Sequence, residues 1–268
     1  MSKKIGFIGV GNMASAIIGG ITSVGGVPFS DLVLYDRLPE KCEIYANQGA
    51  RILSSECEVA EASDVLVLAV KPQGFPELLK TLAGAKEIAN KLIVTIAAGI
   101  TVDTISAALK TSSVVRVLPN TPMLIGKGVS VICSSETVSP EDFDFVVSMF
   151  KASGEVVIID ETEMNRIISV TSSSPAYVFA FIKAICDGAT AQGLDGESLL
   201  SAVCDMVIGS AMLLKQGGKT PAEQISMVTS KGGTTERAMG VLQERDLTGI
   251  MEEAMKACTA RADELSGH

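Results

Sequence analysis

A glycine-rich turn near the start of the chain constrains the fold more than any other stretch. An apolar segment, residues 5–8, leads into Gly9 and Gly11, and a helical pattern of apolar residues follows the turn. Together with Ala14, these glycines fit the G-x-G-x-x-G/A fingerprint of a dinucleotide-binding fold. Gly9 allows a tight turn, Gly11 lets a pyrophosphate approach the backbone, and Ala14 keeps the helix close to the strand. The helix N-terminus then offers free N–H groups to the phosphates, although an ordinary strand-to-helix turn can have the same pattern.

Composition and charge limit the classes of function. The 268 residues are 47% hydrophobic and 20% charged, as in a globular chain with one large or two modest domains. The net charge of −9 argues against a nucleic-acid partner, because no basic stripe exists to displace counterions from phosphates. The only histidine is His268, so we expect no metal site.

Cysteines and apolar runs bear on the cellular compartment. The six cysteines are scattered without C-x-x-C pairs, which predicts buried free thiols in a reducing cytosol. The chain enters its first strand at once and leaves no room for a signal peptide. The most apolar runs, 176–186 and 199–214, are interrupted by Lys183 and Asp205, so we interpret them as core or interface helices and not as membrane spans. We therefore expect a cytoplasmic protein with no membrane partner.

Apolar runs alternate with helical patterns through the first part of the chain. The runs predict strands over residues 31–36, 65–70, 92–96 and 114–118, with further candidates at 129–133 and 156–159. The helical patterns between them include 101–109 and a helix that starts near Pro140. This alternation predicts a doubly wound α/β sheet up to about residue 160.

Two charged residues at the end of the second predicted strand bear on the cofactor. Asp36 lies about 20–25 residues past the glycine turn, where an acidic side chain can bind the adenosine ribose hydroxyls of NADH. Arg37 follows directly and could instead hold the 2′-phosphate of NADPH. The sequence leaves NADH and NADPH both open, and both residues could also be solvated turn residues.

The strand signal stops near residue 160, and the rest of the chain is predicted to be helical. We expect helices over residues 163–170, 175–191, 196–216, 221–229 and 234–261. Several of them are apolar nearly all round and present more apolar surface than a small helical domain can bury alone. We therefore predict two domains, 1–160 for dinucleotide binding and 161–268 for dimerisation and substrate binding, and a homodimer built on the helices.

The lack of a histidine before the last residue, and one polar segment, restrict the reactions that the protein can catalyse. Reduction of a ketone usually needs a histidine or similar group to exchange the hydroxyl proton, and no histidine precedes His268. A cyclic imine in its iminium form accepts hydride directly and gives an amine without such a group. In the segment 228–235, clustered hydroxyls beside Gly232 and Gly233 can bind a carboxylate through hydroxyl and backbone N–H groups. A capped turn between two helices would show the same pattern.

At this segment the chain resembles the pyrroline-5-carboxylate reductase family, and the resemblance covers the whole length in matching order. Residues 9–14, G-V-G-N-M-A, are similar to the family's G-x-G-N-M-A turn. Residues 69–73 and 118–122 are similar to its A-V-K-P-Q and M-P-N-T-P segments. Residues 174–177 are similar to the end of S-G-S-G-P-A-Y, and residues 229–235 to T-S-P-G-G-T-T. The resemblance implies reduction of L-1-pyrroline-5-carboxylate to L-proline with NADPH or NADH, the last step of proline biosynthesis.

The resemblance also implies an architecture and a set of site residues. The architecture is a Rossmann-type dinucleotide-binding domain followed by an all-α dimerisation domain, in an intertwined dimer that is often assembled further into a decamer. The residues implied to hold the pyrophosphate are Ile8, Gly9, Val10, Gly11, Asn12 and Met13, with Asp36 and Arg37 near the adenosine ribose. Those implied to line the nicotinamide half are Ala69, Val70, Lys71, Pro72 and Ala97. Those implied to bind the substrate are Ser230, Gly232, Gly233 and Thr234 at the carboxylate, and the catalytic Thr235 at the ring nitrogen.

Some positions depart from the family pattern, and two other functions stay open. Lys231 replaces a proline, and Ser172 and Ser174 replace the two glycines of S-G-S-G. Glu56 stands where an asparagine commonly touches the cofactor ribose. A β-hydroxyacid dehydrogenase would need a catalytic lysine where this chain has Phe179, and Lys183 lies a turn too late. A non-enzymatic dinucleotide sensor would be expected to lose the substrate loop, whereas Ser230 and residues 232–235 are intact here.

Overall fold

The computed structural model describes residues 3–266 and divides the chain into two compact units. Unit 1 comprises the residues up to Ser173 together with those from Cys258 onward, and unit 2 is Ser174–Ala257. The predicted domain boundary lies at residue 160. In the structure, the segment 161–173 and the last turns of the final helix belong to unit 1 and not to the helical unit.

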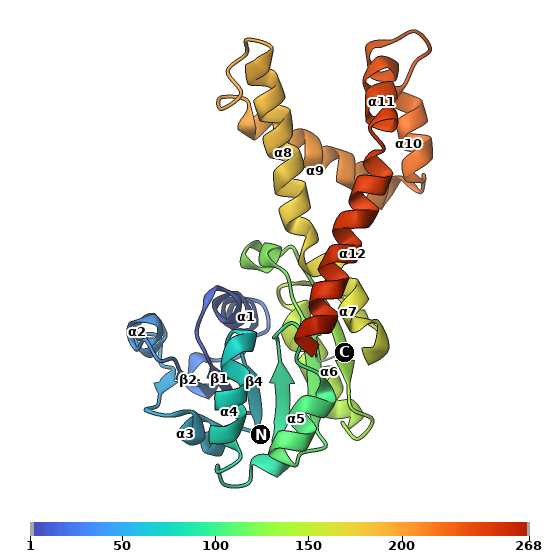
Figure 1. Ribbon diagram of the computed structural model, residues 1–268. Helices are drawn as coiled ribbons and strands as arrows, with labels where there is room; N and C mark the ends of the chain where they lie inside the picture. Colours follow the sequence, from blue (N-terminus) through green and yellow to red (C-terminus); the bar gives the residue numbers. More distant parts are fainter. Residues whose placement is uncertain (1–2, 267–268) are drawn as a thin grey trace. The chain divides into compact units, whose positions relative to one another are not determined.

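Within the described residues, unit 1 is built on an eight-stranded sheet in the order β3-β2-β1-β4-β5-β6-β7-β8 (Figure 1). β1 pairs in parallel with β2 on one side and with β4 on the other, so the strand order reverses at β1. The predicted doubly wound, Rossmann-type sheet is therefore confirmed. The strands are β1 Ile5–Ile8, β2 Leu32–Tyr35, β3 Arg51–Ile52, β4 Val65–Leu68, β5 Leu92–Thr95, β6 Val114–Leu118, β7 Gly128–Ser134 and β8 Gly154–Ile158.

Two strands have features that the apolar runs did not predict. β3 is only two residues long and pairs with the edge of β2, so no apolar run marks it in the sequence. β7 runs antiparallel to β6 and parallel to β8. The connection between β6 and β7, residues 119–127, is too short for the crossover of a dozen or more residues that a parallel pair needs.

Helices cover both faces of the sheet because successive strand residues point to opposite sides. Phe7 of β1 belongs to one core together with Ile17 of α1. Its neighbour Ile8 belongs to the other core together with Leu78 of α4 and Ile105 of α5. The helices of these two layers are α1 Asn12–Ser23, α2 Glu40–Ala46 and α6 Pro140–Lys151 on the first, and α3 Glu56–Ala62, α4 Phe75–Leu82 and α5 Val102–Leu109 on the second.

A third, smaller core explains why residues 161–173 belong to the sheet unit. Met164 of α7 (Met164–Ile167) and Ile168 of the following π-helix (Ile168–Ser172) are buried together with Leu118 and Val131 of the sheet. Ala262, near the end of α12 (Leu247–Ser266), packs into the same cluster. These contacts attach the last turns of α12 to β6 and β7.

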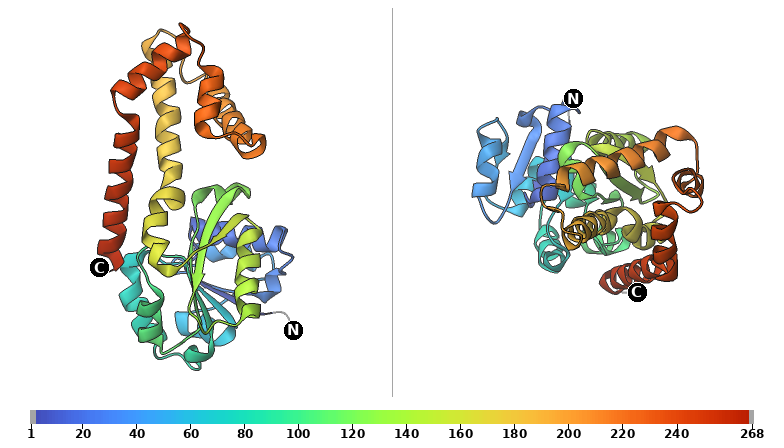
Figure 2. Two further views of the ribbon diagram at one scale, coloured as in Figure 1. Left: turned by 90° about the vertical axis from the view of Figure 1, so that its right-hand side faces the viewer. Right: turned by 90° about the horizontal axis from the view of Figure 1, so that it is seen from above.

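In the residues that the structure describes, unit 2 consists of helices joined by loops, with no strand, and Figure 2 shows its helices in gold, orange and red. They are α8 Ser174–Ala191, α9 Leu200–Gly217, α10 Pro221–Val228, α11 Thr234–Glu244 and the first part of α12. The single helix predicted over 234–261 is wrong, because Asp246 adopts a left-handed conformation with φ of 50° between α11 and α12. Its carboxylate accepts a hydrogen bond from the Gly249 N–H and so caps the start of α12.

The helices of unit 2 have apolar side chains but no core of their own. No residue of α8, α9, α10 or α11 is buried within the described chain. Phe179, Ile208 and Leu213 are 62%, 57% and 61% exposed. Apolar surface of this extent marks an interaction site.

One stretch, Glu161–Ala191, is long and apolar enough to cross a membrane by length and composition alone, with a mean hydropathy of 1.2. It contains the run 176–186 that we interpreted as a core or interface helix. A helix that packs against a second copy of the chain meets the same test of length and composition.

Candidate functional site

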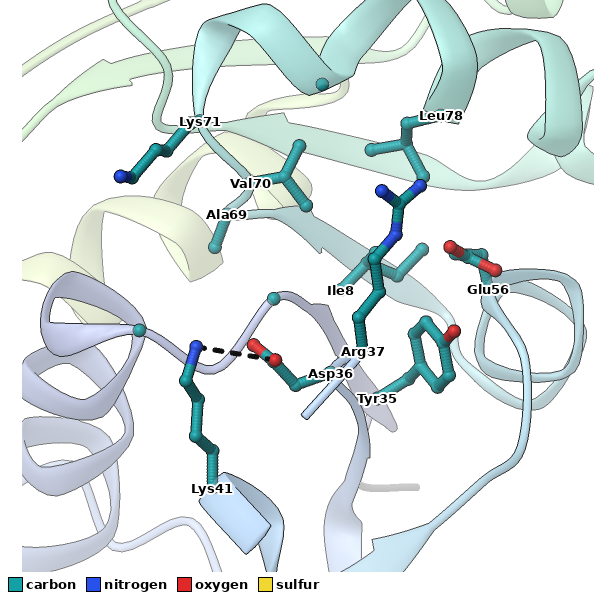
Figure 3. A pocket seen from close by; sticks show the side chains of 13 residues that line it. Ile8, Tyr35, Asp36, Arg37, Lys41, Glu56, Ala69, Val70, Lys71 and Leu78 are labelled. Atoms are coloured by element: carbon teal, nitrogen blue, oxygen red, sulfur yellow. Dashed lines mark ion pairs between the residues drawn. The ribbon is translucent and has the colours of Figure 1, made fainter. Parts of the chain in front are cut away.

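A pocket of about 360 Å³ lies where the carboxyl ends of β1, β2 and β4 meet (Figure 3). This is the point at which the strand order reverses, where open α/β sheets bind their ligands. The residues that line the pocket are Ile8, Gly9, Gly11, Tyr35, Asp36, Arg37, Lys41, Glu56, Ala69, Val70, Lys71, Gly74 and Leu78.

The first glycine of the turn is fixed between two strands. Gly9 has a φ of 92°, and its N–H donates to the Tyr35 carbonyl at the end of β2 over 2.8 Å. A Cβ at this position would lie 2.8 Å from the Ala69 carbonyl oxygen beyond β4. Both the backbone angle and the close approach therefore require glycine here.

The second glycine opens the pocket toward the helix that follows. Gly11 is the N-cap of α1, no side chain caps the helix, and its first turn contains no acidic residue. A Cβ on Gly11 would meet no atom within 4 Å, so the space beside it is open. An uncapped helix N-terminus beside open space fits the pyrophosphate of a dinucleotide.

Asp36 is anchored to the turn. One carboxylate oxygen, Oδ2, accepts a hydrogen bond from the Val10 N–H over 2.7 Å, and Oδ1 accepts one from the Leu38 N–H over 2.9 Å. The Lys41 ammonium, in the first turn of α2, lies 3.4 Å from Oδ1. The Asp36 side chain is only 10% exposed, so the carboxylate is held in one orientation.

Arg37 is exposed and points to a different element. Its guanidinium donates to Glu77 of α4 over 2.8 Å, and this hydrogen bond raises the pKa of Arg37 and lowers that of Glu77. Burial, and next the charge of Glu56, raise the pKa of Tyr35 beside it, and the Arg37 charge partly offsets this rise. The two adjacent residues at the tip of β2 thus have different partners, Asp36 in the glycine turn and Arg37 on α4.

The predicted cofactor residues separate into two groups. Ile8, Gly9, Gly11, Asp36, Arg37, Ala69, Val70 and Lys71 line the pocket. Val10, Asn12, Met13, Pro72 and Ala97 do not, and Val10 and Ala97 are buried in the cores. The lining residues that the prediction missed are Tyr35, Lys41, Gly74 and Leu78, and Glu56, noted above as a departure from the family pattern, lines the pocket too. Lys41 was recognisable in the sequence as a cation one helical turn after Asp36, whereas the contact of Leu78 depends on how α4 packs.

The predicted substrate residues come together in one loop of unit 2. The loop joins α10 to α11, with Gly232 at a φ of 77° and Gly233 as the N-cap of α11. The Gly233 N–H donates to the Ser230 carbonyl over 2.9 Å, which closes a tight turn. Thr234 and Thr235 then form the first turn of α11, and Thr235 is half-buried.

The loop already binds a carboxylate, that of its own Glu236. The Gly232 N–H donates to the Glu236 carboxylate over 2.7 Å. Sequence reasoning missed this residue, because its role depends on the left-handed turn at Gly232. The contact shows that a backbone N–H of this loop is directed so that a carboxylate can accept from it.

The cysteines are free, but most of them are not buried. Cys42 and Cys133 are buried, whereas the other four are half-buried, so the prediction of buried thiols is wrong for those four. Burial, and next the charge of Glu161, raise the pKa of Cys133 to about 12. Within residues 3–266, no group of three or more histidine, cysteine or acidic side chains could hold a metal ion.

Comparison with known proteins assigns the chain to a family. The model for pyrroline-5-carboxylate reductase dimerisation matches residues 161–265, and that for coenzyme F420-dependent NADP oxidoreductases matches residues 4–99. Pyrroline-5-carboxylate reductase of Escherichia coli is 37% identical over 270 residues, which cover 99% of both chains. The chain belongs to the pyrroline-5-carboxylate reductase family.

Solved structures of pyrroline-5-carboxylate reductases have the same fold. The enzyme from Coxiella burnetii is 29% identical with a TM-score of 0.89, covering 99% of each chain. The Plasmodium falciparum pyrroline carboxylate reductase, solved with NADP bound, is 26% identical with a TM-score of 0.89, covering 99% of this chain and 98% of that one.

Membership of the pyrroline-5-carboxylate reductase family agrees with the state of Lys183. A β-hydroxyacid dehydrogenase would need a free catalytic lysine in this region. Lys183 instead forms an ion pair with Asp187 over 2.6 Å, and its side chain is 75% exposed. No observation in unit 2 favours this other function.

The two glycines of the turn should respond differently to alanine. Gly9→Ala should lower both the thermal stability and the affinity for NADH, because the backbone angle alone costs about 1–2 kcal/mol and the methyl group would clash with Ala69. Gly11→Ala, at a φ of −88°, should leave the stability unchanged and lower only the affinity, because its methyl group would enter the pocket. Thermal unfolding and calorimetric titration with NADH measure the two effects. An equal loss of stability in both variants would contradict this assignment.

Proposed function

We propose that this protein reduces L-1-pyrroline-5-carboxylate to L-proline by hydride transfer from NADH or NADPH, the last step of proline biosynthesis. The proposal rests on the joint presence, in a member of this family, of a dinucleotide pocket at the glycine turn and an intact loop suited to a carboxylate. Unit 1 would bind the dinucleotide, and the loop of unit 2 would bind the substrate carboxylate.

Different residues of the pocket would contact different parts of the dinucleotide. Gly11 and the uncapped N-terminus of α1 would hold the pyrophosphate, since no side chain competes for the N–H groups there. Asp36 would face the adenosine ribose, and Val70 and Lys71 would line the nicotinamide half. When bound, NADH or NADPH supplies the hydride.

The loop supplies donors for the substrate carboxylate. Ser230, Gly232, Gly233 and Thr234 would provide hydroxyl and backbone N–H groups. The 2.7 Å contact between the Gly232 N–H and the Glu236 carboxylate supports this role. Lys231 is exposed, and we assign it no contact with the substrate.

The proton balance of the reaction suits this set of side chains. Hydride addition to the carbon of a protonated C=N bond gives the amine N–H directly, so no group has to supply a second proton. Histidine is absent from the chain before His268, and the reaction does not need one. Thr235 would hydrogen-bond the ring nitrogen and hold the C=N bond in place.

Turnover of the purified protein tests the function. We expect oxidation of NADH or NADPH that depends on added L-1-pyrroline-5-carboxylate and gives proline as the product. The absorbance of the reduced nicotinamide follows the reaction. Omission of the substrate is the control. If neither cofactor is oxidised in the presence of substrate, the proposed function is wrong.

Thr235→Ala should lower kcat by about 100-fold, because the hydroxyl acts on the reacting nitrogen. The dissociation constant for NADH should stay the same, since Thr235 is not part of the dinucleotide pocket. Ser226→Ala, which removes an exposed hydroxyl from α10, is the matched control and should keep full activity. A similar loss of turnover and of NADH affinity in Thr235→Ala would show that the role is misassigned.

We also propose that the protein is a cytoplasmic homodimer that can assemble further, up to a pentamer of dimers. The dimerisation model covers residues 161–265, and no residue of α8–α11 is buried in a single chain. A second copy packed on these helices would cover their apolar side chains, including those of α8, which forms the second part of the stretch Glu161–Ala191. On this proposal that stretch is an interface segment and not a membrane span.

Light scattering tests the assembly. The protein should be a dimer or a multiple of a dimer, and Ile208→Glu should produce monomers, because it places a charge on the apolar surface of α9. Ile44→Glu is the matched control, since Ile44 of α2 is equally exposed at 57% and lies in unit 1. A monomeric native protein would count against the interface.

A further inference from the structure

The tip of β2 places an acid and a base side by side, and the structure shows which of them is fixed toward the pocket. Asp36 is anchored through both carboxylate oxygens and is 10% exposed. Arg37 is 64% exposed and extends toward α4 (Figure 3). The carboxylate is therefore a permanent feature of the ribose end, whereas the guanidinium is held by an exposed contact elsewhere.

Asp36 keeps acceptor capacity for a hydroxyl group. Its Oδ1 faces both the Leu38 N–H and the Lys41 ammonium, but Oδ2 has one recorded donor, the Val10 N–H. A carboxylate oxygen has two lone pairs, so Oδ2 can accept a further hydrogen bond. A ribose 2′-hydroxyl can donate that bond, whereas a 2′-phosphate has no proton to donate and repels the carboxylate.

The cations near the ribose end are already compensated. Lys41 lies 3.4 Å from Asp36, and Arg37 lies 2.8 Å from Glu77. In both ion pairs the positive charge is balanced by a carboxylate, so neither cation is free to bind a 2′-phosphate dianion. A site built for a 2′-phosphate would instead direct an uncompensated arginine toward it.

Glu56 adds a further negative charge to this end of the pocket. It is the first residue of α3, is half-buried and lines the pocket beside Tyr35 (Figure 3). Among the residues that the structure describes, no lysine or arginine lies within ion-pair distance of it. The charged residues that line the pocket are the acids Asp36 and Glu56 and the bases Arg37, Lys41 and Lys71. Arg37 and Lys41 are paired with Glu77 and Asp36, so within the described residues Glu56 is the acid of the lining that has no ion-pair partner.

We propose that the pocket selects NADH over NADPH, with Asp36 as the acceptor for the ribose 2′-hydroxyl and Glu56 as the residue that excludes a 2′-phosphate. The inference rests on the proposed function only for the identity of the cofactor class. The Plasmodium relative has the same fold and was solved with NADP bound, so the fold alone does not decide between NADH and NADPH. On this proposal, the side chains of the pocket decide it.

Calorimetric titration of the full-length protein with NAD⁺ and with NADP⁺ tests the proposal without turnover. The native protein should bind NAD⁺ at least tenfold more tightly than NADP⁺. This is about the effect expected when the 2′-phosphate is repelled by two carboxylates. Glu56→Gln should reduce this ratio by about fivefold through tighter NADP⁺ binding, with little change for NAD⁺. High salt should also reduce the ratio, because it screens the repulsion.

Glu141→Gln is the control variant, because it removes the same charge from an exposed position on α6 outside the pocket, and the binding ratio should not change. Equal or tighter binding of NADP⁺ by the native protein, or an unchanged ratio in Glu56→Gln, would overturn the proposal. The ratio of kcat/KM for the two reduced cofactors gives a second reading. Selective NAD⁺ binding without turnover would overturn the proposed function alone, and turnover that favours NADPH would overturn this inference alone.

Discussion

The close contact between Gly9 and the end of β4 is the constraint on which the dinucleotide pocket depends. The chain leaves β1 at a φ of 92°, and the Ala69 carbonyl stands where a side chain would begin. The Asp36 carboxylate then holds the next residue of the turn through the Val10 N–H. These two contacts fix the turn against β4 and β2, so that Gly11 and the start of α1 open onto the pocket. Without them, the N–H groups that suit a pyrophosphate would have no fixed direction.

The two units reach stability by different means. Unit 1 buries its apolar side chains within one chain, on both faces of the sheet, and its pocket rests on those cores. Unit 2 has helices with no buried residue, so its apolar side chains need a second chain to cover them. On the proposed function, dinucleotide binding depends on the packing of one chain, whereas the substrate loop between α10 and α11 lies in a unit that depends on assembly.

The limits of prediction from sequence have local physical causes. Apolar runs located the longer strands but missed β3, because a two-residue edge strand needs no apolar run. The periodicity also missed the break at Asp246, since a single left-handed residue between two helices leaves the apolar pattern intact. At the site, residues close to the fingerprint were predicted, such as Gly9 and Asp36. Leu78 and Glu236 were missed because they reach their positions through helix packing and a turn at Gly232.

The sequence by itself determined the class of fold, the place of the candidate dinucleotide pocket and the family, because glycine spacing, strand–helix alternation and motif order are local properties of the chain. It also identified the loop 229–235. Only the tertiary structure decided which charge at the tip of β2 is fixed against the glycine turn. Asp36 and Arg37 are neighbours in the chain, but their directions are set by Val10 and Glu77, which lie far from them in sequence. A difference that depends on such distant partners has no signature in the order of the residues.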